Sequence, residues 1–296
     1  MEKKIEQIFK NHSKKLMILP ILLILFSAIF LINQQLTTGE VIQKDISLSG
    51  GMTVTLYTDV QIDKHLLKIT LEKDFSEILI RGLSEFGTDK EVGVVIDTPD
   101  INEEDMKKGI LEVTGITLTE ENSSIEVVGS SLGDSFFKQM VKALIFAFLF
   151  MSLVVLITFR KLLPSFAIVI VALGDLMITL AIINLMNMRI SSAGIAALLL
   201  LIGYSIDTDV LLTTRLLKNR EGTIIESVIS SMKTGLTMSI TTISAITAAY
   251  FVSSSLILKQ MFLIIIIGLL VDIILTYMLN APMLADYAEK QLGGKN

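Results

Sequence analysis

Six long apolar runs dominate this sequence and limit what it can fold into. They occupy residues 16–36, 137–159, 164–187, 191–214, 234–252 and 260–282. A helix needs about 20 mostly apolar residues to cross a bilayer, and each run is close to that length or longer. The composition agrees, because only 19% of the residues are charged, whereas a soluble domain carries about 25%. The sequence therefore predicts an α-helical polytopic membrane protein with six transmembrane helices.

The distribution of basic residues predicts how these helices are oriented, because cytoplasmic loops carry an excess of lysine and arginine. With the N-terminus inside, the cytoplasmic side collects Lys3, Lys4, Lys10, Lys14, Lys15, Arg160, Lys161, Arg215, Lys218, Arg220, Lys290 and Lys295, and the outer side collects Lys138, Lys142, Arg189 and Lys259. We therefore expect a multi-pass protein of the plasma membrane whose segments 1–15, 215–233 and 283–296 are cytoplasmic. The first run is expected to remain as an anchor, because its apolar core is too long for a signal peptide and no small-residue cleavage site follows it.

The stretch 37–136 differs from the rest of the chain and is expected to fold as a small α+β domain outside the cytoplasm. It holds 20 of the 30 acidic residues but only 8 of the 25 basic ones, a formal charge of −12 that leaves +7 elsewhere. Alternating apolar residues predict strands at 52–58 and 91–97. Helical spacing predicts helices at 62–85 and 103–113. A hairpin is expected to pair 116–120 with 124–128, turning at Asn122 and Ser123.

Several ionisable side chains lie where a membrane helix is expected. Asp175, Asp207, Asp209 and Asp272 fall inside the apolar runs, and Lys233 stands at the start of the fifth. An aspartate at the centre of a spanning helix costs about 2.5 to 3.5 kcal/mol if it faces lipid. We therefore expect these groups to face the interior of the bundle or a water-filled path.

A buried carboxylate suits the carriage of protons. Burial favours its neutral form, so it can take up a proton from one side and release it when water or a cation approaches. We favour this role for Asp175 and Asp207, with Lys233 as a possible cationic switch. For Asp209, which points about 200° away from Asp207 around a helix, and for Lys233, polar contact between helices is an equally open interpretation.

Other classes of chemistry have little support in the sequence. The chain has no cysteine, and its two histidines, His12 and His65, lie in unrelated segments, so a metal site is not expected. It contains no Gly-rich phosphate loop with Lys-Ser/Thr, so ATP hydrolysis is not expected either. No basic surface with interleaved aromatic residues indicates nucleic acid. We expect no cofactor and no enzymatic activity.

Five short motifs occur in order along the chain. Gly50 and Gly51 follow the first run, and Gly129, Leu132 and Gly133 form a Val-Gly-x-x-Leu-Gly segment before the second. Gly174 precedes Asp175 in the third run. The fourth run contains Gly203, Tyr204 and Asp207 and ends near Arg215, and Ala281-Pro282 ends the sixth. Together these motifs resemble those of the SecF family of protein-export subunits, part of the SecD/SecF family and related to the resistance-nodulation-division (RND) superfamily.

The resemblance implies a fold, partners and a function. It implies an RND-like half bundle with a ferredoxin-like outer domain, paired with a SecD-type subunit. It also implies use of the proton gradient to assist translocation of secreted preproteins through the Sec translocon, the SecY complex, in contact with membrane lipid.

The chain departs from the bacterial pattern at three places and resembles the archaeal branch. Carboxylates at Asp207 and Asp209 flank Thr208, where bacterial members carry the aspartate, so either could be the one that titrates. Lys233 replaces an arginine, and Asp272 replaces a small residue.

Three other interpretations remain open. Gly174-Asp175 with a second membrane aspartate is similar to an intramembrane aspartyl protease, but the Tyr-Asp and Pro-Ala-Leu motifs of that class are missing. A homodimeric RND-type half transporter for lipids or small molecules is the second alternative. The third is a structural adaptor whose aspartates only hold helices together.

Overall fold

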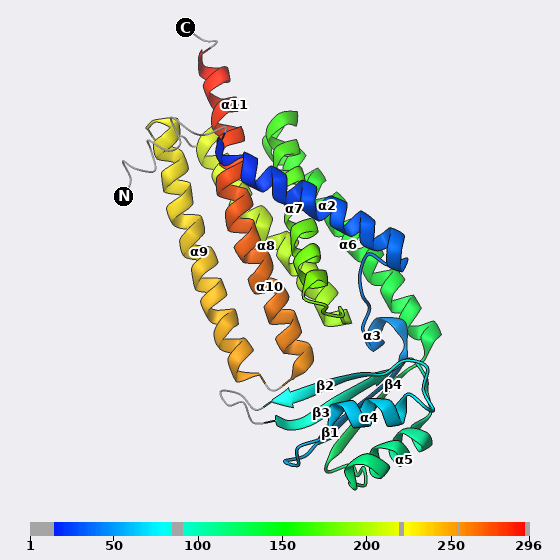
Figure 1. Ribbon diagram of the computed structural model, residues 1–296. Helices are drawn as coiled ribbons and strands as arrows, with labels where there is room; N and C mark the ends of the chain where they lie inside the picture. The colour runs from blue at the N-terminus through cyan, green and yellow to red at the C-terminus, as the bar shows by residue number, and fades with distance from the viewer. Residues whose placement is uncertain (1–14, 85–90, 219–221, 254, 294–296) are drawn as a thin grey trace.

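Long helices form one end of the molecule in the computed structural model, which describes residues 15–84, 91–218, 222–253 and 255–293 (Figure 1). Five of them are single helices: α2 (Ile18–Thr38), α6 (Ser130–Phe159), α7 (Leu162–Leu185), α8 (Ser192–Leu217) and α9 (Ile224–Val252). The sixth is continuous through α10 (Leu256–Leu275), the π-helix η1 (Thr276–Asn280) and α11 (Ala281–Gly293). The described residues thus hold six helices long and apolar enough to cross a membrane, as the sequence predicts.

The ends of several helices differ from the expected ones. Helix α6 begins at Ser130 rather than near 137, so its first turns belong to the stretch assigned to the acidic domain. Helix α9 begins at Ile224, within the expected loop 215–233, because Thr223 and Glu226 form a capping box that starts the helix early. The basic residues Lys3, Lys4, Lys10, Lys14, Arg220 and Lys295, together with His12, lie outside the described residues.

A small α+β domain connects α2 to α6. Its main elements are β1 (Gly51–Tyr57), α4 (Lys64–Leu71), β2 (Leu79–Ser84), β3 (Glu91–Thr98), α5 (Glu103–Thr114) and β4 (Ser123–Val128), preceded by the short helix α3 (Ile46–Ser49). The sheet is antiparallel in the order β2-β3-β1-β4. This β-α-β-β-α-β order with two helices on one face is the ferredoxin-like arrangement. The expected α+β domain between the first two spanning helices is therefore confirmed.

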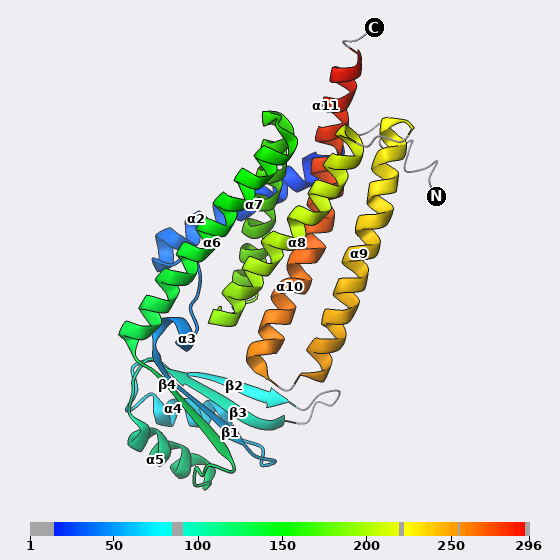
Figure 2. The ribbon, with the colours of Figure 1, turned by 180° about the vertical axis from the view of Figure 1, so that it is seen from behind.

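The two faces of this sheet have different neighbours. Alternate residues of β1, Met52, Val54 and Leu56, are fully buried and pack in one core with residues of α4 and α5. Thr53, Thr55 and Tyr57 point to the opposite face, because successive residues of a strand alternate sides. That face lies toward the ends of α9 and α10 (Figure 2). The side of the sheet toward the bundle is thus the side opposite α4 and α5.

Two of the predicted elements in the domain were wrong. The helix expected at 62–85 ends at Leu71, and residues 79–84 instead form strand β2, which pairs with β3. The apolar spacing continues past the end of α4 because Phe75 and Ile78, which lie outside the helix, are buried in the same core as residues of α4. Spacing alone therefore assigned residues 79–84 wrongly to a helix. Residues 116–120 form no strand, since β4 pairs with β1 rather than with them. The Asn122 side chain satisfies backbone groups of this loop, because it accepts a hydrogen bond from Thr119 N and donates one to Thr117 O.

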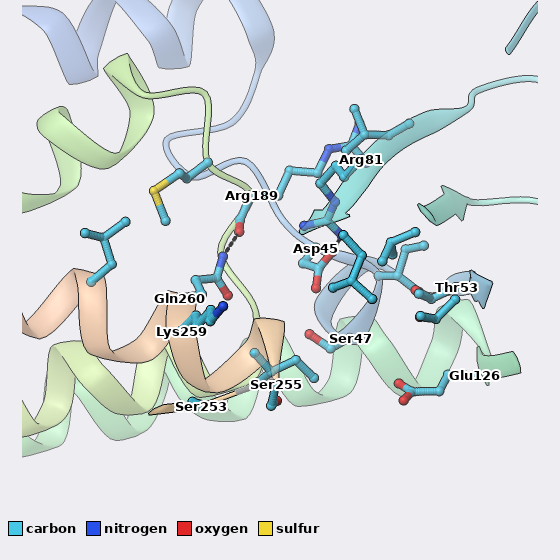
Figure 3. A pocket seen from close by; sticks show the side chains of 18 of the residues that line it. Asp45, Ser47, Thr53, Arg81, Glu126, Arg189, Ser253, Ser255, Lys259 and Gln260 are labelled. Atoms are coloured by element: carbon cyan, nitrogen blue, oxygen red, sulfur yellow. Dashed lines mark hydrogen bonds and ion pairs between the residues drawn. The ribbon is translucent and has the colours of Figure 1, made fainter. Parts of the chain in front are cut away.

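A polar junction joins the domain to the bundle. Here the segment 41–47 runs beside the end of α7 and the loop 186–191 that joins α7 to α8. Backbone hydrogen bonds link Asp45 N to Ile190 O at 3.0 Å and Ile190 N to Gln43 O at 2.7 Å. Gln260 of α10 completes the junction by accepting from Ser191 Oγ and donating to Arg189 O (Figure 3). The domain therefore contacts α7, α8 and α10 through one hydrogen-bonded network, here called the domain–bundle junction.

A close approach of two glycines fixes the domain against α6. Gly50 adopts a left-handed φ of 81°, and a Cβ on Gly133 would lie 2.5 Å from Gly50 N and 2.9 Å from Ser49 C. These are backbone atoms that cannot move aside independently of the chain. Two of the motif glycines, Gly50 and Gly133, therefore permit a backbone contact that a side chain at position 133 would block.

We predict that Gly133→Ala lowers the free energy of unfolding by about 1–3 kcal/mol, the usual cost of overpacking. Gly203→Ala is the matched control, because a Cβ there would meet nothing within 4 Å. An open helical position should gain up to about 1 kcal/mol from alanine. Chemical unfolding in detergent compares the two. Equal effects would contradict the close approach.

A second prediction concerns Asp45 at the junction. Burial raises the pKa of Asp45 above its usual value, and the neighbouring Asp97 carboxylate raises it further, while Arg81 acts in the opposite direction. The folded state therefore holds this proton more tightly than the unfolded state, so stability falls as the pH rises above about 4. Asp45→Asn should stabilise the protein at pH 7, and the gain should shrink toward pH 4. Thermal unfolding at both pH values tests this, and a gain independent of pH would contradict it.

Candidate functional site

Three aspartates lie buried in the centre of the bundle. Asp175 of α7, Asp209 of α8 and Asp272 of α10 each expose 1% of their surface or less. The three helices pack against one another, and the three carboxylates interact electrostatically. We call this set the carboxylate cluster. It combines residues that are distant in the sequence.

Neutral side chains provide the hydrogen bonds of the cluster. Asn280 Nδ2 donates to Asp209 Oδ1 at 2.6 Å. The Thr276 hydroxyl lies 3.1 Å from Asp209 Oδ1 and 3.3 Å from Asp272 Oδ1. The Thr208 hydroxyl lies 3.1 Å from Asp272 Oδ2. Because a hydroxyl carries one proton, Thr276 can donate to Asp209 or to Asp272 but not to both at once.

Several atoms of the cluster still have capacity for another partner. Asp175 Oδ1, Asp209 Oδ2, Asn280 Oδ1, Ser205 Oγ and Thr179 Oγ1 are buried with no hydrogen-bond partner. A buried polar group without a partner costs about 1–3 kcal/mol. The interior is therefore arranged to accept protons or water as well as the bonds it already makes.

The charge state of the cluster follows from its surroundings. Three adjacent carboxylates in an apolar interior cannot all be ionised, because each charge raises the free energy of the next. The hydrogen bonds described above come from hydroxyl and amide groups, which bring no compensating positive charge. Among the described residues, no group of three or more His, Asp or Glu side chains is arranged to hold a metal ion. At least one of the three carboxylates is therefore expected to be neutral.

The structure separates the other two predicted relay residues from this cluster. Asp207 is exposed on the opposite side of α8 from Asp209, as a spacing of two residues requires. It shares an exposed stripe with Leu200 and Gly203 at positions i, i+3 and i+7. Lys233 is exposed on α9. Our preference for Asp207 over Asp209 as the interior carboxylate thus differs from the observed placement.

The remaining motif residues fall into different environments. A Cβ on Gly174 would meet the side chain of Ile24, and one on Gly235 would meet Tyr277, whereas Gly129 and Gly203 have open space. The Tyr204 hydroxyl accepts from Thr242 Oγ1 at 3.3 Å. Further from the cluster, Arg215 Nη1 donates to Ser230 Oγ, and Leu132 is half exposed. Close helix packing therefore explains Gly174 and Gly235 but not Gly203.

Sequence reasoning missed Thr276 and Asn280. They lie at the two ends of the π-helix η1, which directs both side chains toward Asp209. Short π-helical segments inside α-helices are frequent at functional sites. The available signal was an asparagine inside an apolar run, where an unpaired amide is costly. Its partner could not be identified from one sequence.

Comparison with known proteins places the chain in a family. Residues 110–290 match the family model described as "Protein export membrane protein SecD/SecF, C-terminal". The chain is 32% identical to the protein-export membrane protein SecF of Pyrococcus furiosus, covering 99% of this chain and 97% of that protein. The SecF of Methanolacinia petrolearia is 35% identical, with 97% of each chain covered.

The chain belongs to the SecF proteins of the SecD/SecF family. Its relatives are protein-export membrane proteins, so its role lies in protein export across a membrane that it spans several times. Among solved structures it is similar to SecDF from Thermus thermophilus, a translocon-associated membrane protein, with a TM-score of 0.70 at 21% identity. The match covers 94% of this chain but 38% of that one. It shows a shared fold, and the chain corresponds to less than half of the SecDF polypeptide.

The contact between Asp209 and Asn280 leads to a testable prediction. Asn280→Ala should destabilise the protein by about 1–3 kcal/mol, because it leaves a buried carboxylate oxygen with fewer donors. Combined with Asp209→Ala in a double-mutant cycle, it should show a coupling energy of about 0.5–3 kcal/mol. Unfolding free energies in detergent provide the measurement. Strictly additive effects would show that the two side chains do not interact.

Proposed function

We propose that this protein works with a SecD-type subunit to couple the proton gradient to late steps of protein secretion through the Sec translocon. The observation that carries the proposal is the carboxylate cluster: three aspartates on three spanning helices, joined by hydroxyl and amide groups. One proton crossing 100 mV releases about 2.3 kcal/mol. That is enough to shift a conformational equilibrium roughly fiftyfold, since 1.4 kcal/mol corresponds to a factor of ten.

The residues of the cluster have distinct roles in this proposal. Asp209 holds a proton in the interior, and Asn280 keeps its carboxylate oriented. The Thr276 hydroxyl lies between Asp209 and Asp272, so it can pass a hydrogen bond from one to the other as their protonation alternates. Asp175 interacts electrostatically with both and extends the set across α7.

The fold supplies a route from the cluster to the domain. Asp175, Asp209 and Asp272 lie on α7, α8 and α10, the same helices that reach the domain–bundle junction. The loop of Arg189 and Ser191 joins α7 to α8, and Gln260 belongs to α10. A change of packing around the carboxylates can therefore be transmitted along these helices to the domain–bundle junction.

The exposed stripe of α8 supports a partner subunit. Asp207 lies about 15 Å from the end of α8 at 1.5 Å per residue, and facing lipid there would cost about 2.5 to 3.5 kcal/mol. A second subunit that covers Leu200, Gly203 and Asp207 removes this cost. We therefore propose that the SecD-type partner packs on this stripe, where Asp207 can join a relay that crosses the subunit boundary.

The basic residues support a cytoplasmic position for both termini. Arg160, Lys161, Arg215 and Lys218 lie at the junctions of α6 with α7 and of α8 with α9, at the end of the bundle remote from the domain (Figure 1). The domain then lies outside the cytoplasm, where it can meet the translocating preprotein. The flanking lysines and arginines contact lipid headgroups on the inner side.

We predict that Asp209→Asn and Asp175→Asn lower export to the level measured without a proton gradient, while each variant still inserts and co-purifies with the SecD-type subunit. Asp207→Asn should also lower export, because it removes the proton-binding group at the proposed subunit boundary. Asp286→Asn is the matched control, a carboxylate of α11 beyond the cluster, and should export normally. The readout is translocation of a secretory protein into proteoliposomes with and without an imposed gradient.

The outcomes separate the alternatives. Undiminished export in the Asp175 and Asp209 variants would remove proton carriage from the proposal. Loss of assembly rather than of activity would indicate a structural adaptor. A homodimer that binds no SecD-type subunit would indicate a half transporter for lipids or small molecules.

A further inference from the structure

Three cations lie where α6 ends, α7 begins and α8 ends, at the end of the bundle remote from the domain (Figure 1). Arg160 follows the last residue of α6, Lys161 precedes α7, and Lys218 follows α8. All three side chains are exposed. None of the ion pairs among the described residues includes any of them. We call this set the basic cluster, and no described carboxylate is paired with it.

Contacts with neighbouring elements hold both lysines in place. Lys218 Nζ donates to Thr158 O at 2.8 Å and lies 5.4 Å from the centre of the Phe159 ring. Lys161 Nζ donates to Gln291 Oε1 at 2.6 Å. An ammonium group has three N–H donors, and in the contacts that the structure describes each lysine uses one. The two lysines therefore have fixed positions and still have donors for a further acceptor.

The backbone of Arg160 favours a different residue. It ends α6 in the left-handed conformation, with φ 51° and ψ 24°. Glycine is the usual residue at such a helix end, because a Cβ there crowds the neighbouring carbonyl oxygen. Among the described residues, only one other non-glycine residue has a positive φ. A strained conformation that persists in a structure indicates a function for the residue that adopts it, and for Arg160 the feature that glycine lacks is the exposed charge.

Apolar side chains are exposed beside the basic cluster. Ile157 of α6 is 61% exposed, and Leu162 and Phe166 of α7 are 78% and 64% exposed. Leu162 and Phe166 share one face of α7, because helical residues four apart lie one above the other. The surface thus combines unpaired cations with hydrocarbon. An anionic lipid matches both features, since it joins a phosphate to apolar chains, whereas free phosphate or an acidic protein segment matches only the cations.

We propose that the basic cluster binds the phosphate-bearing headgroup of an anionic membrane lipid, with the hydrocarbon chains against Ile157, Leu162 and Phe166. Basic sites between spanning helices bind such headgroups in other membrane proteins. One phosphate here meets cations from the ends of α6 and α8 and from the start of α7, so it links three helices. The inference needs only that the protein spans a membrane. It depends neither on which side this end faces nor on proton coupling.

Native mass spectrometry of the full chain in detergent tests the proposal. The probes are dioleoyl phosphatidylglycerol, which is anionic, and dioleoyl phosphatidylcholine, which has the same chains and no net charge. Phosphatidylglycerol should bind several-fold more tightly and should raise the thermal unfolding temperature. Lys161→Gln and Lys218→Gln should each weaken phosphatidylglycerol binding about fivefold, the usual contribution of one cation at a membrane surface. Binding of phosphatidylcholine should not change.

Lys142→Gln provides the control. Lys142 is an exposed lysine of the same helix α6, about 25 Å from the end of α6 at 1.5 Å per residue, so its loss should leave the preference for phosphatidylglycerol unchanged. Equal binding of the two lipids, or an equal effect of Lys142→Gln, would contradict the proposal. An equal thermal shift with inorganic phosphate would contradict the assignment to a lipid.

Arg160→Gly separates the charge from the fold. Glycine suits the left-handed backbone, so the unfolding temperature without lipid should stay the same or rise. Phosphatidylglycerol binding should still fall about fivefold. Unchanged binding in this variant would overturn the proposal, even if the lysine variants failed to fold. Because neither a proton gradient nor an exported protein is used, a negative result would leave the proton-coupling proposal standing.

Discussion

Burial of three carboxylates among apolar helices is the constraint on which the rest of the bundle depends. An unsatisfied charge in such an interior costs several kcal/mol, so the helices must present donors at fixed positions. The π-helix η1 meets this need by directing Thr276 and Asn280 toward Asp209. The same hydrogen bonds hold α8 against the composite sixth helix. The polar cluster therefore specifies how these helices pack, and any change in its protonation alters the contacts that define the packing.

The position of the domain follows from the same helices. Most of the polar contacts at the domain–bundle junction reach the loop between α7 and α8 and the start of α10, and Gly133 brings α6 against Gly50. In α6 and α9, only 11% of the residues in the most apolar 18-residue stretch are buried. The exposed faces of these two helices can therefore contact lipid or another subunit. The bundle thus consists of a central unit of α7, α8 and the sixth helix, which carries the cluster, and of the outer helices α2, α6 and α9, which are mostly exposed.

Much of this fold can be predicted from the sequence because it depends on strong local signals. Six apolar runs and the alternation in β1 need no partner to be recognised. The helix expected over 62–85 failed because its second half pairs with β3, a tertiary contact that local spacing does not encode. At the site, all three members of the cluster were among the candidates. The choice between Asp207 and Asp209 could not be made, because helical geometry places them on opposite faces but does not say which face is inside.

That ambiguity has a physical meaning once the faces are known. Two aspartates separated by one residue on a spanning helix must serve two different surfaces, since they point about 200° apart. Asp209 is stabilised within this chain by Asn280 and Thr276, whereas Asp207 lies on an exposed stripe with Leu200 and Gly203. The free-energy cost of an aspartate that faces lipid is larger than one solvent-exposed contact can offset. Within this chain, α8 is therefore buried on the Asp209 side and exposed on the Asp207 side. The open space beside Gly203 leaves room for a neighbouring helix to approach Asp207 closely.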